Sequence, residues 1–250
     1  MKTVMITGCS SGFGLETARH FLDQGWSVIA TMRTPVEGLL PASNRLRLLP
    51  LDVTDPASIA AAVTLAGDVD VLVNNAGVGW LNALEGTPMA AVRDIFETNT
   101  FGTMALIQAM LPQFRARKAG VIVNVTSSVT LKPLELLSVY TASKAAVNAF
   151  TEVLALELAP FGIRTHVVLP GRSPETRFGA NAQTRMAQGG GFPEPYVQMV
   201  QGVFARFASE PADQVTQAQD VAKAVWRAAT TPATPMRIPA GADALALFRG

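Results

Sequence analysis

The stretch Thr7-Gly8-Cys9-Ser10-Ser11-Gly12-Phe13-Gly14 stands between a short apolar run and a segment with helical periodicity. Its three glycines permit a tight turn and let the backbone come close to whatever the turn holds. The start of the helix behind the turn attracts negative charge, so this order of strand, turn and helix favours a bound pyrophosphate. A Gly-rich turn also serves plain strand-to-helix connections, and other residues must decide between the two.

Beyond this turn, short apolar runs alternate with longer helical patterns along most of the chain. Runs of this kind are typical of strands buried on both faces of a parallel sheet. The expected strands are residues 3–8, 27–33, 46–53, 69–75, 120–127, 163–170 and 236–239, and the expected helices are 13–24, 56–66, 88–117, 139–159 and 217–230. The pattern predicts an α/β fold: a doubly wound parallel sheet (Rossmann fold) of about seven strands with helices on both faces.

Local signals mark two helix starts and one irregular segment. Asp55-Pro56 and Thr87-Pro88 each place a capping side chain before a proline at the first helical position. Residues 171–216 instead carry scattered prolines and the triplet Gly189-Gly190-Gly191. Long connections in compact domains are commonly functional or disordered, so we expect a mobile substrate lid here rather than an ordinary surface connection.

Composition limits the possible partners. The 250 residues are 49% hydrophobic and 16% charged with a net charge of +1, which predicts a single domain spanning 1–250 and gives no basic patch for nucleic acid or lipid. One cysteine and two histidines exclude an intrachain disulfide and make a zinc site improbable, so we expect no metal. Without a signal peptide or a stretch of about 18 apolar residues, we expect a cytoplasmic protein that does not enter a membrane.

The end of the second expected strand indicates which dinucleotide binds. An NAD site usually has a carboxylate there for the ribose hydroxyls, but the run is Ala30-Thr31-Met32-Arg33-Thr34. Arg33 can pair with a 2′-phosphate through its planar guanidinium, and Thr34 offers a second donor. A solvated surface arginine is the alternative. The missing acid favours NADP(H) over NAD(H).

A candidate proton donor begins the helix expected at 139–159. The four-residue spacing of Tyr140 and Lys144 places both side chains on one helix face, one turn apart. An ammonium and a positively charged nicotinamide beside a phenol both favour phenolate, so we expect them to lower the tyrosine pKa from about 10. Because this spacing also occurs by chance, the pair needs support from elsewhere in the chain.

That support comes from a resemblance over almost the whole chain to the short-chain dehydrogenases/reductases. Thr7-Gly-x-x-x-Gly12-x-Gly14 resembles the cofactor turn of that family, Asn74-Asn75-Ala76-Gly77 its strand-end motif and Tyr140-x-x-x-Lys144 its catalytic pair. The serine of the family resembles Ser127, which follows Asn124 by three residues and precedes Tyr140 by thirteen. Its hydroxyl would orient the substrate carbonyl, with Ser128 as the alternative if the turn is one residue tighter.

The resemblance also implies roles for residues elsewhere. Asn99 in Asn99-Thr100-Phe101-Gly102 would hold a water that links Lys144 to a proton path, although a polar residue satisfied by backbone is compatible with the same place. Thr176 stands one place later than the threonine of the family, which leaves its contact with the carboxamide open. The implied coenzyme-binding residues are Gly8, Ser10, Ser11, Gly12, Phe13, Gly14, Arg33, Thr34, Asp52, Val53, Asn75, Ala76, Gly77, Tyr140, Lys144, Pro170, Gly171, Ser173 and Thr176.

These residues predict an NADP(H)-dependent oxidoreductase that moves a hydride between nicotinamide and a ketone, an aldehyde or a secondary alcohol. A non-catalytic dinucleotide-binding sensor or scaffold is the alternative, but it would be free to lose the serine, tyrosine or lysine. An S-adenosylmethionine methyltransferase would share the turn and leave those three side chains unexplained.

The sequence gives weaker signals for the substrate class and for the oligomeric state. The runs Thr31-Met32-Arg33 and Arg237-Ile238-Pro239-Ala240-Gly241-Ala242-Asp243-Ala244 resemble the hydroxysteroid and retinol dehydrogenase branch. We expect an apolar small-molecule substrate, and a homodimer or homotetramer formed through the helices at 88–117 and 139–159. The candidate pocket residues are Trp80, Leu81, Leu131, Leu134, Leu137, Phe178 and Phe192.

Overall fold

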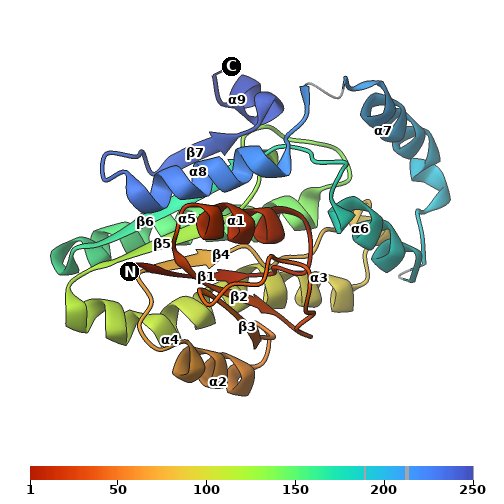
Figure 1. Ribbon diagram of the computed structural model, residues 1–250. Helices are drawn as coiled ribbons and strands as arrows, with labels where there is room; N and C mark the ends of the chain where they lie inside the picture. Colours follow the sequence, from red (N-terminus) through yellow and green to blue (C-terminus); the bar gives the residue numbers. More distant parts are fainter. Residues whose placement is uncertain (189, 212–213, 250) are drawn as a thin grey trace.

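The computed structural model describes residues 1–188, 190–211 and 214–249. Within them, seven parallel strands form one sheet in the order β3-β2-β1-β4-β5-β6-β7 (Figure 1). The order reverses between β1 and β4, where a doubly wound sheet opens a crevice beyond the strand ends. The predicted fold is confirmed. The strands are β1 (Thr3–Thr7), β2 (Ser27–Met32), β3 (Leu46–Pro50), β4 (Val71–Asn74), β5 (Gly120–Val125), β6 (Ile163–Pro170) and β7 (Arg237–Ala240).

Helices cover both faces of the sheet because successive strand residues point to opposite sides. Val4 and Ile6 of β1 pack under α1 (Gly12–Asp23) and α8 (Ala218–Thr230). Met5 faces the other layer, which is formed by α2 (Pro56–Ala66), α4 (Gly102–Arg117) and α5 (Ser138–Leu158). Two apolar cores thus enclose the sheet and hold its strand ends in fixed positions.

The single helix expected at 88–117 is three consecutive elements. They are α3 (Met89–Phe96), the π-helical turn η2 (Glu97–Phe101) and α4. The predicted Thr87 cap is wrong, because Thr87 Oγ1 donates to the Ala83 carbonyl and accepts from Trp80 Nε1 instead. The Asp55 cap of α2 is confirmed, since its carboxylate accepts from Ala57 N at 2.9 Å.

Residues 171–216, hereafter the lid segment, contain two helices that were not predicted. They are α6 (Arg177–Gln188) and α7 (Val197–Ser209), with the 3-10 turn η5 (Glu194–Tyr196) between them; Gly189 lies outside the described residues. The two helices stand at one side of the sheet (Figure 1). The short turns η1 (Leu84–Gly86), η3 (Ser128–Thr130) and η4 (Ala159–Phe161) and the last helix, α9 (Ala242–Arg249), complete the fold. No helix in the described part of the chain is long and apolar enough to cross a membrane.

Candidate active site

The Gly-rich turn after β1 is an open cradle at the N-terminus of α1. Gly8 and Gly12 have φ of +74° and +57°, in the left-handed region that glycine favours. A side-chain carbon on Gly14 would lie 2.4 Å from the Gly8 carbonyl oxygen, so helix and turn touch directly. The N-cap residue Ser11 makes no side-chain capping bond within the described chain, and the first helical turn carries no acid. The N–H groups at the start of α1 are thus available to an anion.

Asn75, at the end of β4, braces the turn from the side. Its Nδ2 donates to the Thr7 and Gly8 carbonyls at 2.9 and 3.3 Å. In return, Thr7 Oγ1 accepts from the backbone N–H groups of Asn75 and Ala76, both at 2.9 Å. These bonds join β1 to β4 at the point where the strand order reverses. Residues 75–77, predicted to line the site, therefore lie beside the turn.

Tyr140 and Ser127 meet beyond the end of β5. Ser127 caps η3 by accepting from Val129 N at 3.3 Å, and its hydroxyl lies close enough to the Tyr140 phenol to lower the phenol pKa. Both side chains are buried, each with 7% of its surface exposed. Ser128, the alternative, is the first residue of η3. The geometry therefore favours Ser127 as the partner of the phenol.

Lys144 lies one helical turn after Tyr140 and points to the same place. Its Nζ donates to the Val125 carbonyl at 3.1 Å and lies 6.0 Å from the centre of the Tyr140 ring. A side-chain carbon on Gly77 would be 3.3 Å from that Nζ. The ammonium thus sits between the ends of β4 and β5.

Burial governs both titrating groups of the site. It lowers the pKa of Lys144 to about 8 and raises the pKa of Tyr140, while the Ser127 hydroxyl acts in the opposite direction on the phenol. We expected the ammonium to lower the pKa of the phenol, but desolvation outweighs any such effect. Burial therefore keeps the phenol protonated at neutral pH, which is the form that a general acid must have before it transfers its proton.

Asn99 occupies the π-helical turn η2 and joins three parts of the site. Its Oδ1 accepts from Val78 N at 2.8 Å, and its Nδ2 donates to the Val78 carbonyl at 3.0 Å and to Ser143 Oγ at 3.1 Å. Ser143 Oγ donates to the Tyr140 carbonyl at 2.7 Å. Ser143 was not predicted; its only signal was a small polar residue inside an apolar helix.

The residues predicted to hold the adenine end lie just after β2 and β3. Arg33 and Thr34 are exposed just after β2. Asp52 accepts from Thr54 N and Thr54 Oγ1, which lower the pKa of its carboxyl, with Arg33 as a weaker cause of the same direction. Val53 is buried and packs against Gly102. A Cβ atom added to Gly102 would lie 2.7 Å from the Val53 carbonyl oxygen.

The residues that follow β6 pack against the Gly-rich turn. Thr176 packs on the Gly-rich turn, since an added carbon on Gly12 would lie 3.3 Å from its side chain. Thr176 Oγ1 donates to the Ser173 carbonyl at 2.9 Å. Ser173 Oγ is buried without a hydrogen-bond partner among the described residues. This hydroxyl therefore has a donor that no described residue uses, on the short stretch between the end of β6 and Thr176.

Helix α6 of the lid segment packs over the phenol. The Phe178 ring lies 5.7 Å from the Tyr140 ring, centre to centre. An added carbon on Gly79 would be 2.7 Å from Phe178 and 3.1 Å from Ala182. Gly79 is a residue that sequence reasoning missed, because only the packed helix shows why no side chain stands there.

Helix α7 has its own apolar cluster with the loops that follow β4 and β5. Phe192, predicted to line the pocket, packs with Phe204, which in turn contacts Phe207. Leu81 and Leu136 complete the cluster, whereas Trp80 lies in a separate one under α3. The lid segment is therefore seated on the site side of the sheet.

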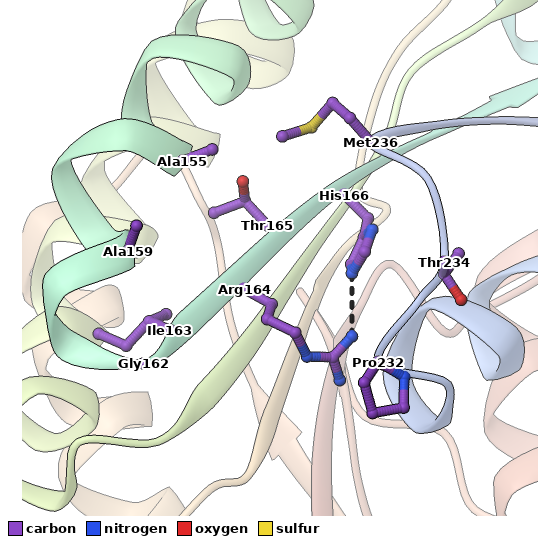
Figure 2. A pocket seen from close by; sticks show the side chains of 10 residues that line it. All are labelled: Ala155, Ala159, Gly162, Ile163, Arg164, Thr165, His166, Pro232, Thr234 and Met236. Carbon is purple, nitrogen blue, oxygen red and sulfur yellow. Dashed lines mark hydrogen bonds between the residues drawn. The ribbon is translucent and has the colours of Figure 1, made fainter.

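A cavity of about 420 Å³ lies away from these residues, at the amino half of β6 (Figure 2). Arg164 donates to His166 Nε2 at 3.1 Å and to the Ala228 and Ala229 carbonyls at the end of α8. His166 Nδ1 pairs with the Pro235 carbonyl at 3.0 Å. Since Tyr140 lies beyond the opposite ends of the strands, this cavity is separate from the candidate active site.

Curated relatives carry dehydrogenase names. Retinol dehydrogenase 8 of Homo sapiens is 35% identical over 257 residues, which cover 94% of this chain and 80% of that protein. Retinol dehydrogenase 8 of Bos taurus is 42% identical over 182 residues, covering 68% of this chain and 58% of that protein. The 11-beta-hydroxysteroid dehydrogenase type 2 of Homo sapiens is 37% identical over 182 residues, covering 68% and 45%. The chain thus spans under two thirds of the length of some relatives.

Solved structures match over the whole chain. A short-chain dehydrogenase from Streptomyces avermitilis superposes with a TM-score of 0.85 at 33% identity, covering 100% of this chain and 92% of that one. One from Burkholderia cenocepacia J2315, in complex with NADP, gives 0.78 at 26% identity and covers 100% and 94%. The sequence model of the family described as short chain dehydrogenase matches residues 2–186. The chain therefore belongs to the short-chain dehydrogenase family, in its retinol and hydroxysteroid dehydrogenase branch.

Proposed function

We propose that the chain is an NADP(H)-dependent oxidoreductase that transfers a hydride between nicotinamide and a ketone, an aldehyde or a secondary alcohol. One observation carries the proposal: the Tyr140 phenol lies close to the Ser127 hydroxyl, which lowers the phenol pKa, and beside the buried Lys144 ammonium. Burying an amine costs free energy, and a core that served only stability would fill this place with an apolar side chain.

A dinucleotide fits the residues present. Because Gly14 packs directly against Gly8, no side chain of these residues covers the start of α1, where backbone N–H groups can bind a pyrophosphate. The Ser173 hydroxyl, which has no partner among the described residues, offers a further donor. A bound nicotinamide coenzyme supplies or accepts a hydride. The chain would hold it with Gly8, Ser10, Ser11, Gly12, Phe13 and Gly14 at the phosphates, Asp52 and Val53 at the adenine, Asn75, Ala76, Gly77, Tyr140 and Lys144 at the riboses, and Pro170, Gly171, Ser173 and Thr176 toward the nicotinamide.

In the reductive direction, the substrate carbonyl oxygen accepts hydrogen bonds from Ser127 and Tyr140. The phenol gives its proton to that oxygen as negative charge develops there, and Ser127 stabilises the same charge. Lys144 stabilises the phenolate that remains. Asn99 is held by Val78 and Ser143 and positions this face of α5. In the proposed mechanism it also holds a water that links Lys144 to a proton path.

Arg33 supports NADP(H) as the coenzyme. It is exposed at the end of β2, near enough to Asp52 to affect the carboxyl pKa, and the run from Ala30 to Thr34 contains no acid. A guanidinium there favours a 2′-phosphate over a free ribose hydroxyl. The solved relative from Burkholderia cenocepacia holds NADP, which agrees with this choice.

The substrate side favours an apolar carbonyl compound. Phe178 of the lid segment places an apolar ring next to the phenol, and Phe192 of the same segment packs in the apolar cluster that contains Leu136. The retinol and hydroxysteroid names of the relatives agree with such a substrate. The non-catalytic sensor is less well supported, because it gives Ser127, Tyr140 and Lys144 no reason to meet.

The test is an NADPH-oxidation screen across aliphatic, aromatic and steroid-like ketones and aldehydes, repeated with NADH. We expect turnover on at least one apolar carbonyl compound and a preference for NADPH. NADPH binding without turnover on any of them would favour the sensor, and the absence of binding would contradict the proposal.

A further inference from the structure

The two ends of the lid segment meet in a compact group of hydrogen bonds. Gly171 N, just after β6, donates to Thr216 Oγ1 at 2.9 Å, and Thr216 N donates back to the Arg172 carbonyl at 2.9 Å. Thr216 is fully buried. The segment therefore leaves the sheet and returns to it at the same place.

Asp243, in the first turn of α9, fastens both ends together. Its Oδ2 accepts from Arg172 N at 2.6 Å, and its Oδ1 accepts from Thr216 Oγ1 at 2.7 Å. Hydrogen bonds to a carboxylate are shorter and stronger than those between neutral groups. We call Gly171, Arg172, Thr216 and Asp243 the clasp.

Two glycines make room for the clasp. An added carbon on Gly171 would lie 2.0 Å from Asp243 Oδ1, and one on Gly241 would lie 1.9 Å from Thr216 Oγ1. Gly241 also has a φ of +98°, which disfavours any other residue. The Gly241-Ala242-Asp243 run at the C-terminus, which proton transfer does not require, thus has a structural reason.

The clasp holds a strap that crosses the site. Residues 171–176 run from the end of β6 to the Gly-rich turn, where Thr176 reaches Gly12. Between these points lies the buried, unpartnered Ser173 hydroxyl. Helix α9 itself packs against η3, the turn capped by Ser127. A ligand that extends from the Gly-rich turn toward Tyr140 must pass along this strap.

We propose that Asp243 is a positioning residue that, through Gly171 and Arg172, holds the strap and its Ser173 hydroxyl against the nicotinamide half of the coenzyme. The inference rests on the proposed function. The clasp bears on one half of the coenzyme, because within the described residues no hydrogen bond joins it to the Gly-rich turn or to Arg33, the residues proposed for the adenine and phosphate half.

The experiment compares two probes on the full chain: NADPH and adenosine 2′,5′-bisphosphate, which lacks the nicotinamide half. The variant Asp243→Asn keeps the size of the side chain. Its N–H₂ group would stand opposite one of the two groups that donate to Asp243, the Arg172 N–H or the Thr216 hydroxyl. We expect it to weaken NADPH binding about tenfold and to leave the dissociation constant of adenosine 2′,5′-bisphosphate within about twofold. Asp94→Asn, at an exposed site on α3, is the control and should change neither value.

Thr216 gives an independent pair of variants should Asp243→Asn fail to fold. Thr216→Val removes the hydroxyl and should reproduce the loss confined to NADPH, whereas Thr216→Ser keeps it and should bind as the wild type does. Equal weakening of both probes, or no change in either, would overturn the role of Asp243. A wild-type chain that does not bind NADPH would overturn the proposed function, and this inference with it.

Discussion

Lys144 has only 5% of its surface exposed and donates one hydrogen bond, to the Val125 carbonyl. Burial favours the neutral amine, and the pKa of about 8 expresses that cost. At pH 7 the group is still mostly protonated, so it can stabilise a phenolate on Tyr140. The chain thus keeps a charge where an apolar side chain would make the fold more stable.

Replacing Lys144 by Met should therefore stabilise the chain and abolish turnover. The buried amine has a pKa below its value in the unfolded chain, so its cost is fully present below about pH 8 and disappears as pH rises toward 10.5. We expect a gain of roughly 2 kcal/mol at pH 7 in denaturant unfolding, shrinking between pH 8 and 10. A variant that is less stable than wild type at pH 7 would contradict this account of the buried charge.

Arg33 is the residue that we propose selects NADP(H) over NAD(H). Arg33→Ala should raise KM for NADPH by roughly tenfold or more, the effect of losing charged hydrogen bonds to a phosphate, and change KM for NADH less than about threefold. Steady-state kinetics with both coenzymes measures this. Arg93→Ala, at an exposed position on α3, is the control. Equal effects on NADPH and NADH would show that Arg33 does not contact the 2′-phosphate.

Helix α6 can pack close to the Tyr140 phenol because Gly79 has no side chain. Phe178 and Ala182 rest on that residue, and the Phe178 ring continues onto Tyr140. The wall that a substrate meets above the phenol is therefore a property of the whole helix and of how closely it approaches the loop after β4.

Gly79→Val should lift α6 from the site. We expect KM for the carbonyl substrate to rise about tenfold while NADPH binding stays within about twofold, because the Gly-rich turn is not touched. Gly179→Val lies on α6 itself, where an added carbon meets nothing within 4 Å, and should leave KM unchanged. An unchanged KM in Gly79→Val would show that α6 does not form the substrate wall.

The sequence predicted elements well where burial alone sets the pattern. The strand at 163–170 and the helix at 56–66 were placed with their observed ends. The strand expected at 69–75 begins only at Val71, because Val69 N donates to the Gln113 side chain. Most candidate site residues also follow from motifs at strand ends, since parallel strands bring those ends to one edge.

Elements whose stability comes from tertiary packing could not be predicted. Glycines and prolines dominate the lid segment locally, yet α7 forms because Val200 and Val203 find an apolar cluster contributed by distant loops. The π-helical turn at Asn99 depends on Val78 and Ser143, which are remote in sequence. The clasp likewise joins residues 171, 216 and 243, which are far apart in the sequence. No regular spacing of residue types predicts contacts of this kind.

At the scale of the whole molecule, α4 and α5 present an apolar face beside a groove of about 320 Å³. On α5, Leu156 is 75% exposed and Val153 is exposed one turn earlier, while the exposed Phe161 of η4 lines the groove. Exposed apolar side chains gathered on one element are typical of an interaction site. We propose that two copies of the chain pair through this face, an isologous contact.

Leu156→Arg should shift the chain toward monomer on sizing chromatography coupled to light scattering, because it places a charge at the centre of that contact. Leu65→Arg, on the exposed side of α2, is the matched control and should elute as the wild type does. A wild-type chain that elutes as a monomer would overturn the proposed assembly.

In the proposed mechanism, the Tyr140 phenol gives its proton to the substrate oxygen. Single-turnover oxidation of NADPH by wild type and Tyr140→Phe, with a ketone from the screen and alongside NADPH binding to both, tests this transfer. We expect a rate at least about a hundredfold lower in the variant, the scale of general acid catalysis, with the NADPH dissociation constant within about threefold. A Tyr140→Phe chain that oxidises NADPH at near the wild-type rate would contradict this mechanism.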